Sequence, residues 1–543
     1  EIIGAGVTEF LLGGNPIQTS TTTTSIITVP GTSLGINTEN KLFIGDRDTT
    51  TAFGGLENTT FNSDKCTITN VSESGSNTLV TVTNPNSDES TSLGATGGGS
   101  NMKAYWGWNT AIDVDIGANT TIKNCRFSKV QTDIDFDYCY RSTFTNNLST
   151  TLHGPEGYGV QIGPSCTEIT ITGNRFDGLY RTGILASSST GTPKDIFIRN
   201  NIIKGFRRYG VYIYISNYAE IIDNTFTSGS LLDIDTTAQP DSSYSLAAYC
   251  FELKCNNNSF QNVESAGIFW EPRYAINTTT DKTSAFGGSL TNLYAKTNRG
   301  QTFSYPTAQI QNNRIAGRTG DGVFRTRGIV IRPRSTNGPI WGLQIQNNKI
   351  SSCQTGIDIV QNLTTPTGVS PQIRGMQIQN NFITGERENV ALTKGVAITF
   401  TTSTAGVSSR STIITGNILE SNSQGYGNTG QDKDSVIQLG TTSTKYTSLE
   451  LSLLNDNIFY NGYRSVETGD AANHVMRYSI FFCNVSHNTD DQENANKCFG
   501  PSNTSEIPLG APTSSTTPGR GKAPQNITEG VFNNYYGTKY TGG

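Results

Sequence analysis

Apolar and polar residues alternate in a short pattern that recurs through the middle of the chain. Segments such as ITITGNRFDG at 169–178, IFIRNNIIKG at 196–205 and LQIQNNKISS at 343–352 share one order: apolar, any, apolar, two polar, Asn, any, apolar. A period of two is typical of a strand with one buried face. The asparagines in register are Asn174, Asn201, Asn224, Asn258, Asn313, Asn348, Asn381, Asn417 and Asn457, with weaker copies of the pattern at Cys125 and Asn147.

The repeated asparagine suits the turn that ends each strand, because asparagine tolerates the left-handed backbone conformation better than most residues. Stacked turns would align these side chains into a hydrogen-bonded ladder. The intervals between successive asparagines are 27 and 23 residues at first and 33 to 55 residues later. A short interval that lengthens indicates a repeating coil with loops inserted between its strands.

A second strand in each coil begins near a glycine. Gly183, Gly210 and Gly267 each lie nine residues after a repeated asparagine, and they open the segments GILA, GVYIYI and GIFW. Two or three short strands per coil predict an all-β parallel β-helix, in which each coil stacks about 4.8 Å above the last. The leucine pattern and helical side of leucine-rich repeats are missing, which excludes that solenoid.

The repeat divides the chain into three parts. Residues 1–105 lack it and contain short strand-like pieces between Thr-, Ser- and Gly-rich linkers. We interpret them as an N-terminal β-rich region that also caps the solenoid end. Residues 106–465 form the predicted β-helix, which would hold the binding and catalytic residues. Residues 466–543 lose the repeat, and we expect a C-terminal region that serves trimerisation.

Composition supports an all-β protein and excludes several functions. The 543 residues include 15% charged and 34% hydrophobic residues, with many Gly, Asn, Ser and Thr. Such a composition disfavours a helical bundle, a Rossmann-type enzyme and a coiled coil. A net charge of −5 without a basic stripe argues against a nucleic-acid partner. The chain has no apolar run long enough to insert into a membrane, and no signal peptide is visible at its start.

Histidine and cysteine usage narrows the chemistry further. His153, His474 and His487 form no metal-ligand spacing, which argues against a zinc enzyme or a Ser-His-Asp hydrolase. Nine scattered cysteines are not a disulfide framework, and we expect most of them to be buried free thiols.

Aligning coils on the second strand predicts a candidate catalytic face. We call each strand of this stack a rung. We expect residues 233–236 to form the rung between the one that contains Tyr214 and the one that contains Phe269. The carboxylates on this face are then Asp233, Asp235 and Glu271, and the predicted substrate-binding residues are Tyr212, Tyr214, Phe269 and Arg273. Diagonal neighbours on adjacent strands lie about 7–8 Å apart. That separation falls within the roughly 6.5–9.5 Å used in inverting glycoside hydrolysis, where one carboxyl donates a proton and the other activates water.

Other interpretations stand beside this one. Outward acids on a β-helix also serve simply as a solvated face. Asp133, Asp135 and Asp137 share one face, where a cation such as calcium, a catalytic role or plain solvation are the alternatives. His153 and Glu156 form a possible acid–base pair in a loop. The basic cluster Arg325, Arg327, Arg332 and Arg334 suits an acidic polysaccharide or a lyase, or else pairs with acids of a neighbouring subunit.

The strand–Asn–strand coil with Gly-, Ser-, Thr- and Asn-rich turns resembles the right-handed parallel β-helix superfamily of pectate lyases and bacteriophage tailspikes, over residues 106–465. The match to tailspikes is better because irregular insertions and flanking regions accompany the repeat. The resemblance implies a homotrimer on the virion tail, outside the cell, attached through a part N-terminal to this sequence. It also implies binding and cleavage of bacterial surface polysaccharide without a cofactor. Asp233, Asp235 and Glu271 match the paired carboxylates of that family by geometry alone.

Three functions therefore follow from the sequence. The first is a tailspike endo-glycosidase that acts on O-antigen or capsule. The alternatives are a non-catalytic receptor-binding spike and a polysaccharide lyase of the same fold, with or without calcium.

Overall fold

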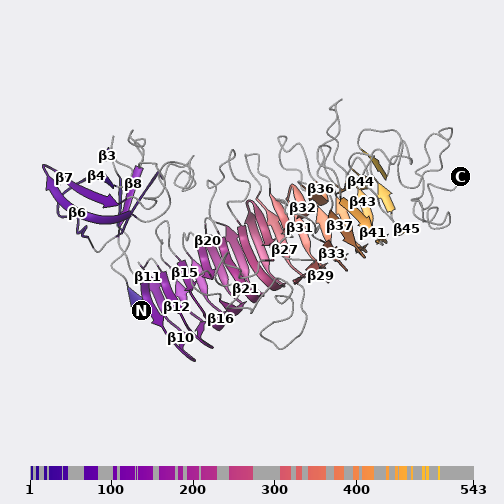
Figure 1. The fold of residues 1–543 in the computed structure, drawn as a ribbon, viewed down its shortest axis with the longest axis horizontal. Helices are drawn as coiled ribbons and strands as arrows, with labels where there is room; N and C mark the ends of the chain where they lie inside the picture. The colour runs from indigo at the N-terminus through magenta and orange to yellow at the C-terminus, as the bar shows by residue number, and fades with distance from the viewer. Residues whose placement is uncertain are drawn as a thin grey trace, which may run out of the picture. The chain divides into compact units, whose positions relative to one another are not determined.

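The fold is described from a computed structural model, shown as a ribbon in Figure 1. The chain divides into two compact units, with Glu1–Pro193, Phe197–Tyr212 and Thr225–Ser245 in the first and Lys194–Ile196, Ile213–Asn224 and Leu246–Gly543 in the second. The described part of the chain contains strands and no helix, so it includes no helix that could span a membrane. The structure describes residues 2–3, 8–11, 17–20, 24–38, 41–46, 66–83, 102–106, 110–128, 130, 132–150, 158–177, 182–186, 193–206, 209–228, 244–272, 306–318, 326–332, 340–361, 372–384, 396–402, 407–420, 436–439, 447–450, 452–460, 466–468, 480–482, 485–487 and 499–501.

The first unit contains an antiparallel sheet of seven strands in the order β2-β8-β5-β6-β7-β4-β3. Its core includes Ile27, Val29, Ile68, Val80 and Val82, which are at most 2% exposed. The strands are β2 (Thr8–Leu11), β3 (Ile17–Ser20), β4 (Thr24–Pro30), β5 (Lys41–Asp46), β6 (Cys66–Ser74), β7 (Asn77–Thr83) and β8 (Met102–Trp106).

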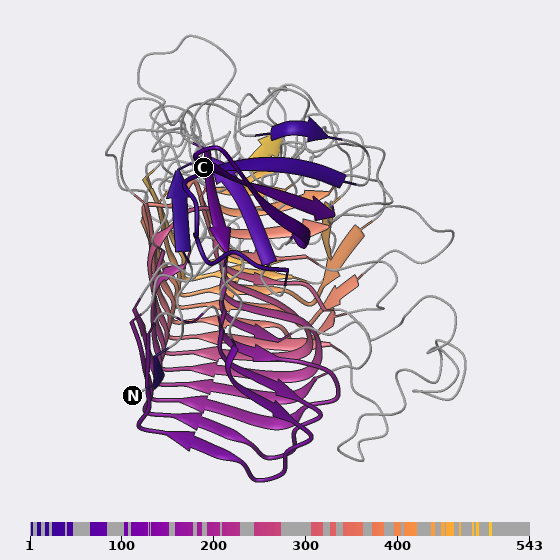
Figure 2. The same cartoon turned by 90° about the vertical axis from the view of Figure 1, so that its left-hand side faces the viewer.

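Parallel coils follow this sheet in the first unit, and Figure 2 shows them stacked one above another. Each coil supplies a strand before the repeated asparagine (first ladder), one directly after it (second ladder) and one near the glycine (third ladder). The first ladder holds β10 (Thr121–Lys123), β13 (Thr143–Thr145) and β16 (Thr167–Thr172). The second holds β1 (Ile2–Ile3), β11 (Arg126–Ser128), β14 (Leu148–Ser149), β17 (Arg175–Asp177), β20 (Ile202–Phe206) and β22 (Thr225–Ser228). The third holds β9 (Thr110–Asp115), β12 (Thr132–Asp137), β15 (Tyr158–Ile162) and β18 (Thr182–Ala186).

The second unit repeats the three ladders. Its first ladder contains β26 (Thr307–Gln311), β30 (Gln344–Gln346), β34 (Gln377–Gln379), β38 (Ile413–Thr415), β42 (Leu453–Asn455) and β45 (Ile480–Phe482). The second contains β24 (Ser259–Val263), β27 (Arg314–Gly317), β31 (Lys349–Ser351), β35 (Phe382–Thr384), β39 (Ile418–Glu420), β43 (Ile458–Tyr460) and β46 (Val485–His487). The third contains β25 (Ala266–Trp270), β28 (Arg327–Ile331), β32 (Thr355–Gln361), β36 (Val396–Thr402), β40 (Ile437–Leu439), β44 (Val466–Thr468) and β47 (Phe499–Pro501).

Three strands are shared by the two units: β19 (Lys194–Arg199), β21 (Tyr209–Ile222) and β23 (Tyr244–Asn256). A further parallel sheet in the second unit has the order β29-β33-β37-β41, formed by β29 (Ile340–Trp341), β33 (Gln372–Arg374), β37 (Val407–Arg410) and β41 (Thr447–Glu450). The predicted parallel β-helix is therefore confirmed. Its stacked strands continue past residue 465 as far as β47.

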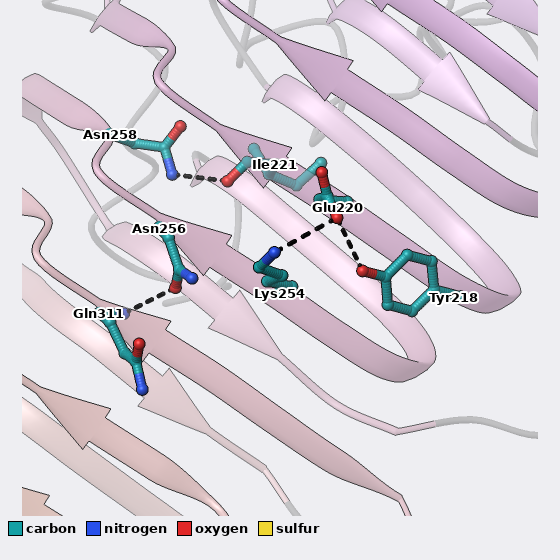
Figure 3. A network of polar contacts seen from close by, with 7 residues as sticks. All are labelled: Tyr218, Glu220, Ile221, Lys254, Asn256, Asn258 and Gln311. Carbon is teal, nitrogen blue, oxygen red and sulfur yellow. Dashed lines mark hydrogen bonds and ion pairs between the residues drawn. The ribbon is translucent and has the colours of Figure 1, made fainter.

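The predicted asparagine ladder is present. Each repeated asparagine is at most 3% exposed, and within two runs the Nδ2 of one asparagine donates to Oδ1 of the asparagine in the next coil. These bonds measure 2.9–3.1 Å along Asn147–Asn174–Asn201 in the first unit, and along Asn224–Asn258–Asn313–Asn348–Asn381–Asn417–Asn457 in the second. The same Nδ2 also donates to a strand carbonyl, as from Asn258 to Ile221 at 2.8 Å (Figure 3). The ladder thus satisfies buried backbone groups where the strands end.

The left-handed residue was predicted one position too late. Positive φ falls on the residue before each ladder asparagine, for example Asn200 (55°), Asn347 (56°) and Gly173 (66°). The preceding residue turns the chain, and this leaves the ladder asparagine free to direct its amide inward. Asparagine and glycine both adopt this conformation readily, which explains why they alternate there.

The glycines of the third ladder lie where two strands approach closely. A Cβ on Gly183, Gly267 or Gly328 would lie 2.5–2.8 Å from a carbonyl oxygen of the next coil. The residues predicted to point inward after these glycines are buried, with Ile184, Ala186, Val211, Ile213, Ile268, Trp270, Ile357 and Ile359 all 0% exposed.

One predicted rung is occupied by a different segment. In the second unit the strand between β21 and β25 is β23, whereas we expected residues 233–236 there. The stretch 229–243, with Asp233 and Asp235, lies outside the described residues. A run of alternating residues inside an insertion therefore imitates a strand of the repeat.

The cysteines behave as predicted in the described residues. Cys139, Cys166, Cys250, Cys255 and Cys353 are buried free thiols, and Cys125 is a half-buried free thiol. Burial raises the pKa of the Cys166 and Cys353 thiols to about 12.

Candidate functional site

An aromatic row runs across the outer side of the third ladder in the second unit. Tyr214 of β21 meets Tyr249 of β23 edge-on, with ring centroids 5.9 Å apart, and Tyr249 meets Phe269 of β25 at 5.4 Å. These rings occupy successive strands, so they form a continuous strip. The sequence pattern did not identify Tyr249 as part of this row, because aligning the coils with one another placed residues 233–236 in its rung.

Tyr212 lies in a similar cluster within the first unit. Its ring centroid is 4.6 Å from that of Tyr209, whose ring in turn stacks on Tyr244 at 6.0 Å. The predicted aromatic residues therefore do gather on the third ladder, and Tyr209 and Tyr244 add to them.

The predicted exposure of Phe269 and Glu271 is wrong. Phe269 is 1% exposed and Glu271 is 0% exposed. Phe269 has a side chain next to it on each adjacent strand. These are the Tyr249 ring, 5.4 Å away between centroids, and Val330, which is the register partner of Phe269. Outward side chains on adjacent strands thus cover one another. The alternation of residues along one strand predicts which way a side chain points, but it does not predict this burial.

Glu271 forms an ion pair with Arg332 on the next rung. Glu271 Oε2 lies 3.7 Å from Arg332 Nε, and the arginine side chain is 23% exposed. Backbone hydrogen bonds fix both residues, from Glu271 N to the Ala248 carbonyl at 3.1 Å and from Arg332 N to the Trp270 carbonyl at 2.9 Å. A buried carboxylate requires such a partner, because removing it from water is costly.

A second ion pair lies one rung further on. Arg327 Nη1 is 3.5 Å from Asp358 Oδ2, and the Thr399 hydroxyl donates to Asp358 Oδ1 at 2.6 Å. Arg327 and Arg332 of the predicted basic cluster therefore pair with acids of their own chain. Arg325, Arg334 and Arg273 lie outside the described residues.

Glu271 and Asp358 are not immediate neighbours on this face. Register places Asp358 two rungs from Glu271 and two residues along the strand. With about 4.8 Å per rung and 3.3 Å per residue, their α carbons lie about 12 Å apart. A second carboxyl nearer to Glu271 would have to come from another segment.

A separate group of aspartates lies on the third ladder of the first unit. Asp135 is in register with Asp113, and Asp137 with Asp115. Burial, followed by the charges of Asp113 and Asp115, raises the pKa of the Asp137 carboxyl. Neighbouring strands lie about 4.8 Å apart, and carboxyl groups about 5–5.5 Å apart are typical of retaining glycosidases.

The other predicted acid–base and metal candidates are less well placed. Asp133, the third predicted acid of that strand, is fully buried. His153 and Glu156 lie outside the described residues. Among the residues that the structure describes, no group of three or more His, Cys, Asp or Glu could hold a metal ion.

The three stacked ladders define the chain as a parallel β-helix protein. The family model for periplasmic copper-binding protein (NosD) matches residues 96–282. Among solved structures, the chain is similar to the Dettilon tailspike protein (gp208), with 12% identity, TM-score 0.31, and coverage of 68% of this chain and 62% of that one. It is also similar to the tailspike protein gp49 from Pseudomonas phage LKA1, with 13% identity, TM-score 0.28, and coverage of 86% and 66%. A third similar structure is described as a glycoside hydrolase, with 8% identity, TM-score 0.24, and coverage of 89% and 77%.

The chain spans less than two thirds of the length of either tailspike. No curated protein matches it in sequence.

Proposed function

We propose that this chain binds and hydrolyses a bacterial surface polysaccharide, O-antigen or capsule, as an endo-glycosidase of a virion tailspike. The observation that supports this most is the aromatic row Tyr214–Tyr249–Phe269, which leads directly to the Glu271–Arg332 pair. Flat aromatic faces pack against the apolar faces of sugar rings, and a few placed polar groups fix their orientation.

Catalysis in this proposal uses paired carboxylates. Glu271 is one member, held beside Arg332, and Asp233 or Asp235 is the other. One carboxyl, protonated, donates to the glycosidic oxygen while the other, ionised, activates water. Tyr212 and Tyr214 bind sugar rings, buried Phe269 supports the Tyr249 ring of the same row, and Arg273 binds an acidic substituent. No cofactor is required, so chelation of divalent cations with EDTA should leave the activity unchanged.

Two observations favour alternatives. Complete burial of Glu271 suits a non-catalytic receptor-binding spike in which the ion pair only supports the face. The raised pKa of Asp137, next to three other aspartates, suits a catalytic acid located in the first unit instead.

Purified O-antigen and capsule polysaccharides test these proposals. New reducing ends without absorbance near 235 nm would indicate hydrolysis, and that absorbance would indicate a lyase. Glu271→Gln and Asp235→Asn should bind but not cleave, while the control Glu252→Gln, on the first ladder, should cleave normally. If only Asp137→Asn abolishes cleavage, the site lies in the first unit. Binding without cleavage by the unmodified chain would leave only the receptor-binding spike.

The proposed assembly is a homotrimer on a virion tail. Light scattering of the purified chain measures the first part of this proposal. A monomeric mass at micromolar concentration would contradict it.

A further inference from the structure

An exposed tryptophan and an arginine lie together on the short four-stranded sheet of the second unit. Trp341 of β29 is 39% exposed, whereas Trp270 is fully buried. The Arg374 guanidinium lies over the Trp341 ring, 5.3 Å from its centroid, on the adjacent strand β33. Tryptophan combines a large flat apolar ring with one N–H donor, so an exposed tryptophan is well suited to bind a ligand.

The backbone holds this pair firmly. Trp341 N donates to the Pro306 carbonyl at 3.1 Å, and Gly342 N donates to the Arg374 carbonyl at 2.9 Å. Gly342 and Gly375 follow the two residues with the same positive φ of 66°, so both strands turn alike into the first ladder. Among the described strands, β29 is the terminal strand of its sheet.

A surface of side-chain amides begins directly after this turn. Gln344, Gln346, Gln377 and Gln379 are half-buried on the first ladder. Gln346 Nε2 donates to Gln377 at 3.0 Å and to Gln379 at 2.8 Å. The amides continue to the preceding coils, where Asn256 accepts from the Gln311 backbone (Figure 3). A primary amide has two donor hydrogens and two acceptor lone pairs, so these bonds use only part of its capacity.

We propose that the Trp341–Arg374 corner and the adjoining amides bind an acidic glycan, one whose sugars carry carboxylate groups. The indole packs against a sugar ring, Arg374 binds the carboxylate, and the glutamine amides bind hydroxyl groups. Arg374 adds a positive charge to this corner, whose other polar side chains are neutral amides. This charge favours an anionic ligand.

The chemistry of the corner favours a glycan over a second copy of this chain. Amides and a single indole dominate it, whereas an interface between copies would be expected to have an apolar centre. The exposed apolar side chains Phe382 and Ile458 lie instead on the second ladder. The corner is thus separate from the aromatic row of the third ladder, and its binding does not depend on hydrolysis there.

Titration of the full chain with uronate oligosaccharides from polygalacturonate, alginate and hyaluronan tests the proposal, with neutral dextran as comparison. At least one uronate glycan should change the tryptophan emission of the unmodified chain, and Trp341→Phe should abolish that change. Arg374→Gln should weaken binding at least tenfold. The control Phe382→Ala removes another exposed ring that faces a cation, Lys349, and should leave binding unchanged.

Each other outcome overturns the proposal: no uronate glycan binds, dextran binds as tightly as the uronates, or Arg374→Gln binds normally. A change of oligomeric state in Trp341→Phe, with glycan binding intact, would assign the corner to a second copy. Glu271→Gln should retain the titration in full. Titration by a uronate glycan, together with no cleavage of O-antigen or capsule polysaccharide, would therefore refute the proposed hydrolysis and leave this second site standing.

Discussion

Replacing Asn348 by alanine should open the β-helix locally at one rung. The Asn348 amide donates to the Ile310 carbonyl at 2.9 Å and to Asn381 Oδ1 at 3.0 Å. Its oxygen accepts from the backbone N and the Nδ2 of Asn313, both at 3.0 Å. The side chain is 1% exposed, so water cannot easily replace these four bonds.

The expected loss of stability follows from the buried groups that lose their hydrogen-bond partners. Each neutral hydrogen bond contributes about 0.5–1.5 kcal/mol, and a buried donor without a partner costs about 1–3 kcal/mol. The alanine variant deprives the Asn313 backbone N–H and the Ile310 carbonyl of their partners. We therefore expect a loss of about 3–5 kcal/mol, concentrated on the neighbouring rungs because each coil contacts only its neighbours.

Amide hydrogen exchange measures this loss rung by rung. Protection of the Asn313 amide should fall most in Asn348→Ala, and thermal unfolding should begin at a lower temperature. The control is Asn347→Gly at the exposed left-handed position beside it, where the chain itself uses Gly173 and Gly416 in other coils. Unchanged protection of Asn313 in Asn348→Ala would refute the idea that the ladder supports the stack.

Three further predictions concern close packing, pH and thiol reactivity. Gly328→Ala should destabilise the chain by about 2–3 kcal/mol in thermal or urea unfolding, because its Cβ would lie 2.5 Å from a carbonyl oxygen of the next coil. The folded-state pKa of Asp137 is raised, so its ionisation destabilises the fold. Asp137→Asn should therefore raise the melting temperature near pH 7, and the gain should vanish as the pH falls below about 4. Burial raises the pKa of the Cys166 and Cys353 thiols to about 12, so iodoacetamide at pH 8 should modify half-buried Cys125 well before either of them, as read by peptide mass spectrometry.

The interior of the coils was predictable because it obeys short-range rules. A residue on the inner side of a strand must be apolar, a turn must satisfy its buried backbone groups, and a close approach of two strands admits only glycine. Each rule leaves a mark at a fixed sequence offset, as at Ile268, Asn258 and Gly267. The repeat therefore predicted the ladders and the inward residues correctly, although it placed the left-handed turn one residue too late.

The outer faces were less predictable because their exposure depends on neighbouring coils. Glu271 and Phe269 point away from the core, yet both are buried by side chains that come from other rungs. In the part of the chain that the structure describes, the Trp341–Arg374 pair belongs to a sheet formed by four coils, so the repeat shared by the other coils could not reveal it. The sequence did contain a weak signal for this sheet. The segments WGLQIQ at 341–346 and RGMQIQ at 374–379 match in four of six positions, and the first position holds Trp341 in one and Arg374 in the other.

The energetics of a solenoid explain why residues 233–236 were wrongly predicted to form a rung. Closing a flexible loop costs free energy that grows only as about (3/2)RT ln n, so each doubling of its length adds about 0.6 kcal/mol. An insertion of the size of 229–243 is therefore tolerated between β22 and β23 without any change to the rungs on either side. Selection can vary such insertions freely, since the ladder asparagines and glycines already specify the stack. Residues that give this chain its specificity are thus expected in the insertions between strands of the repeat, where the period of the repeat predicts least. For that reason the cleavage activities of Asp235→Asn and Glu271→Gln should be compared. Their difference tells whether the catalytic carboxyl comes from an insertion, as Asp235 does, or from a rung, as Glu271 does.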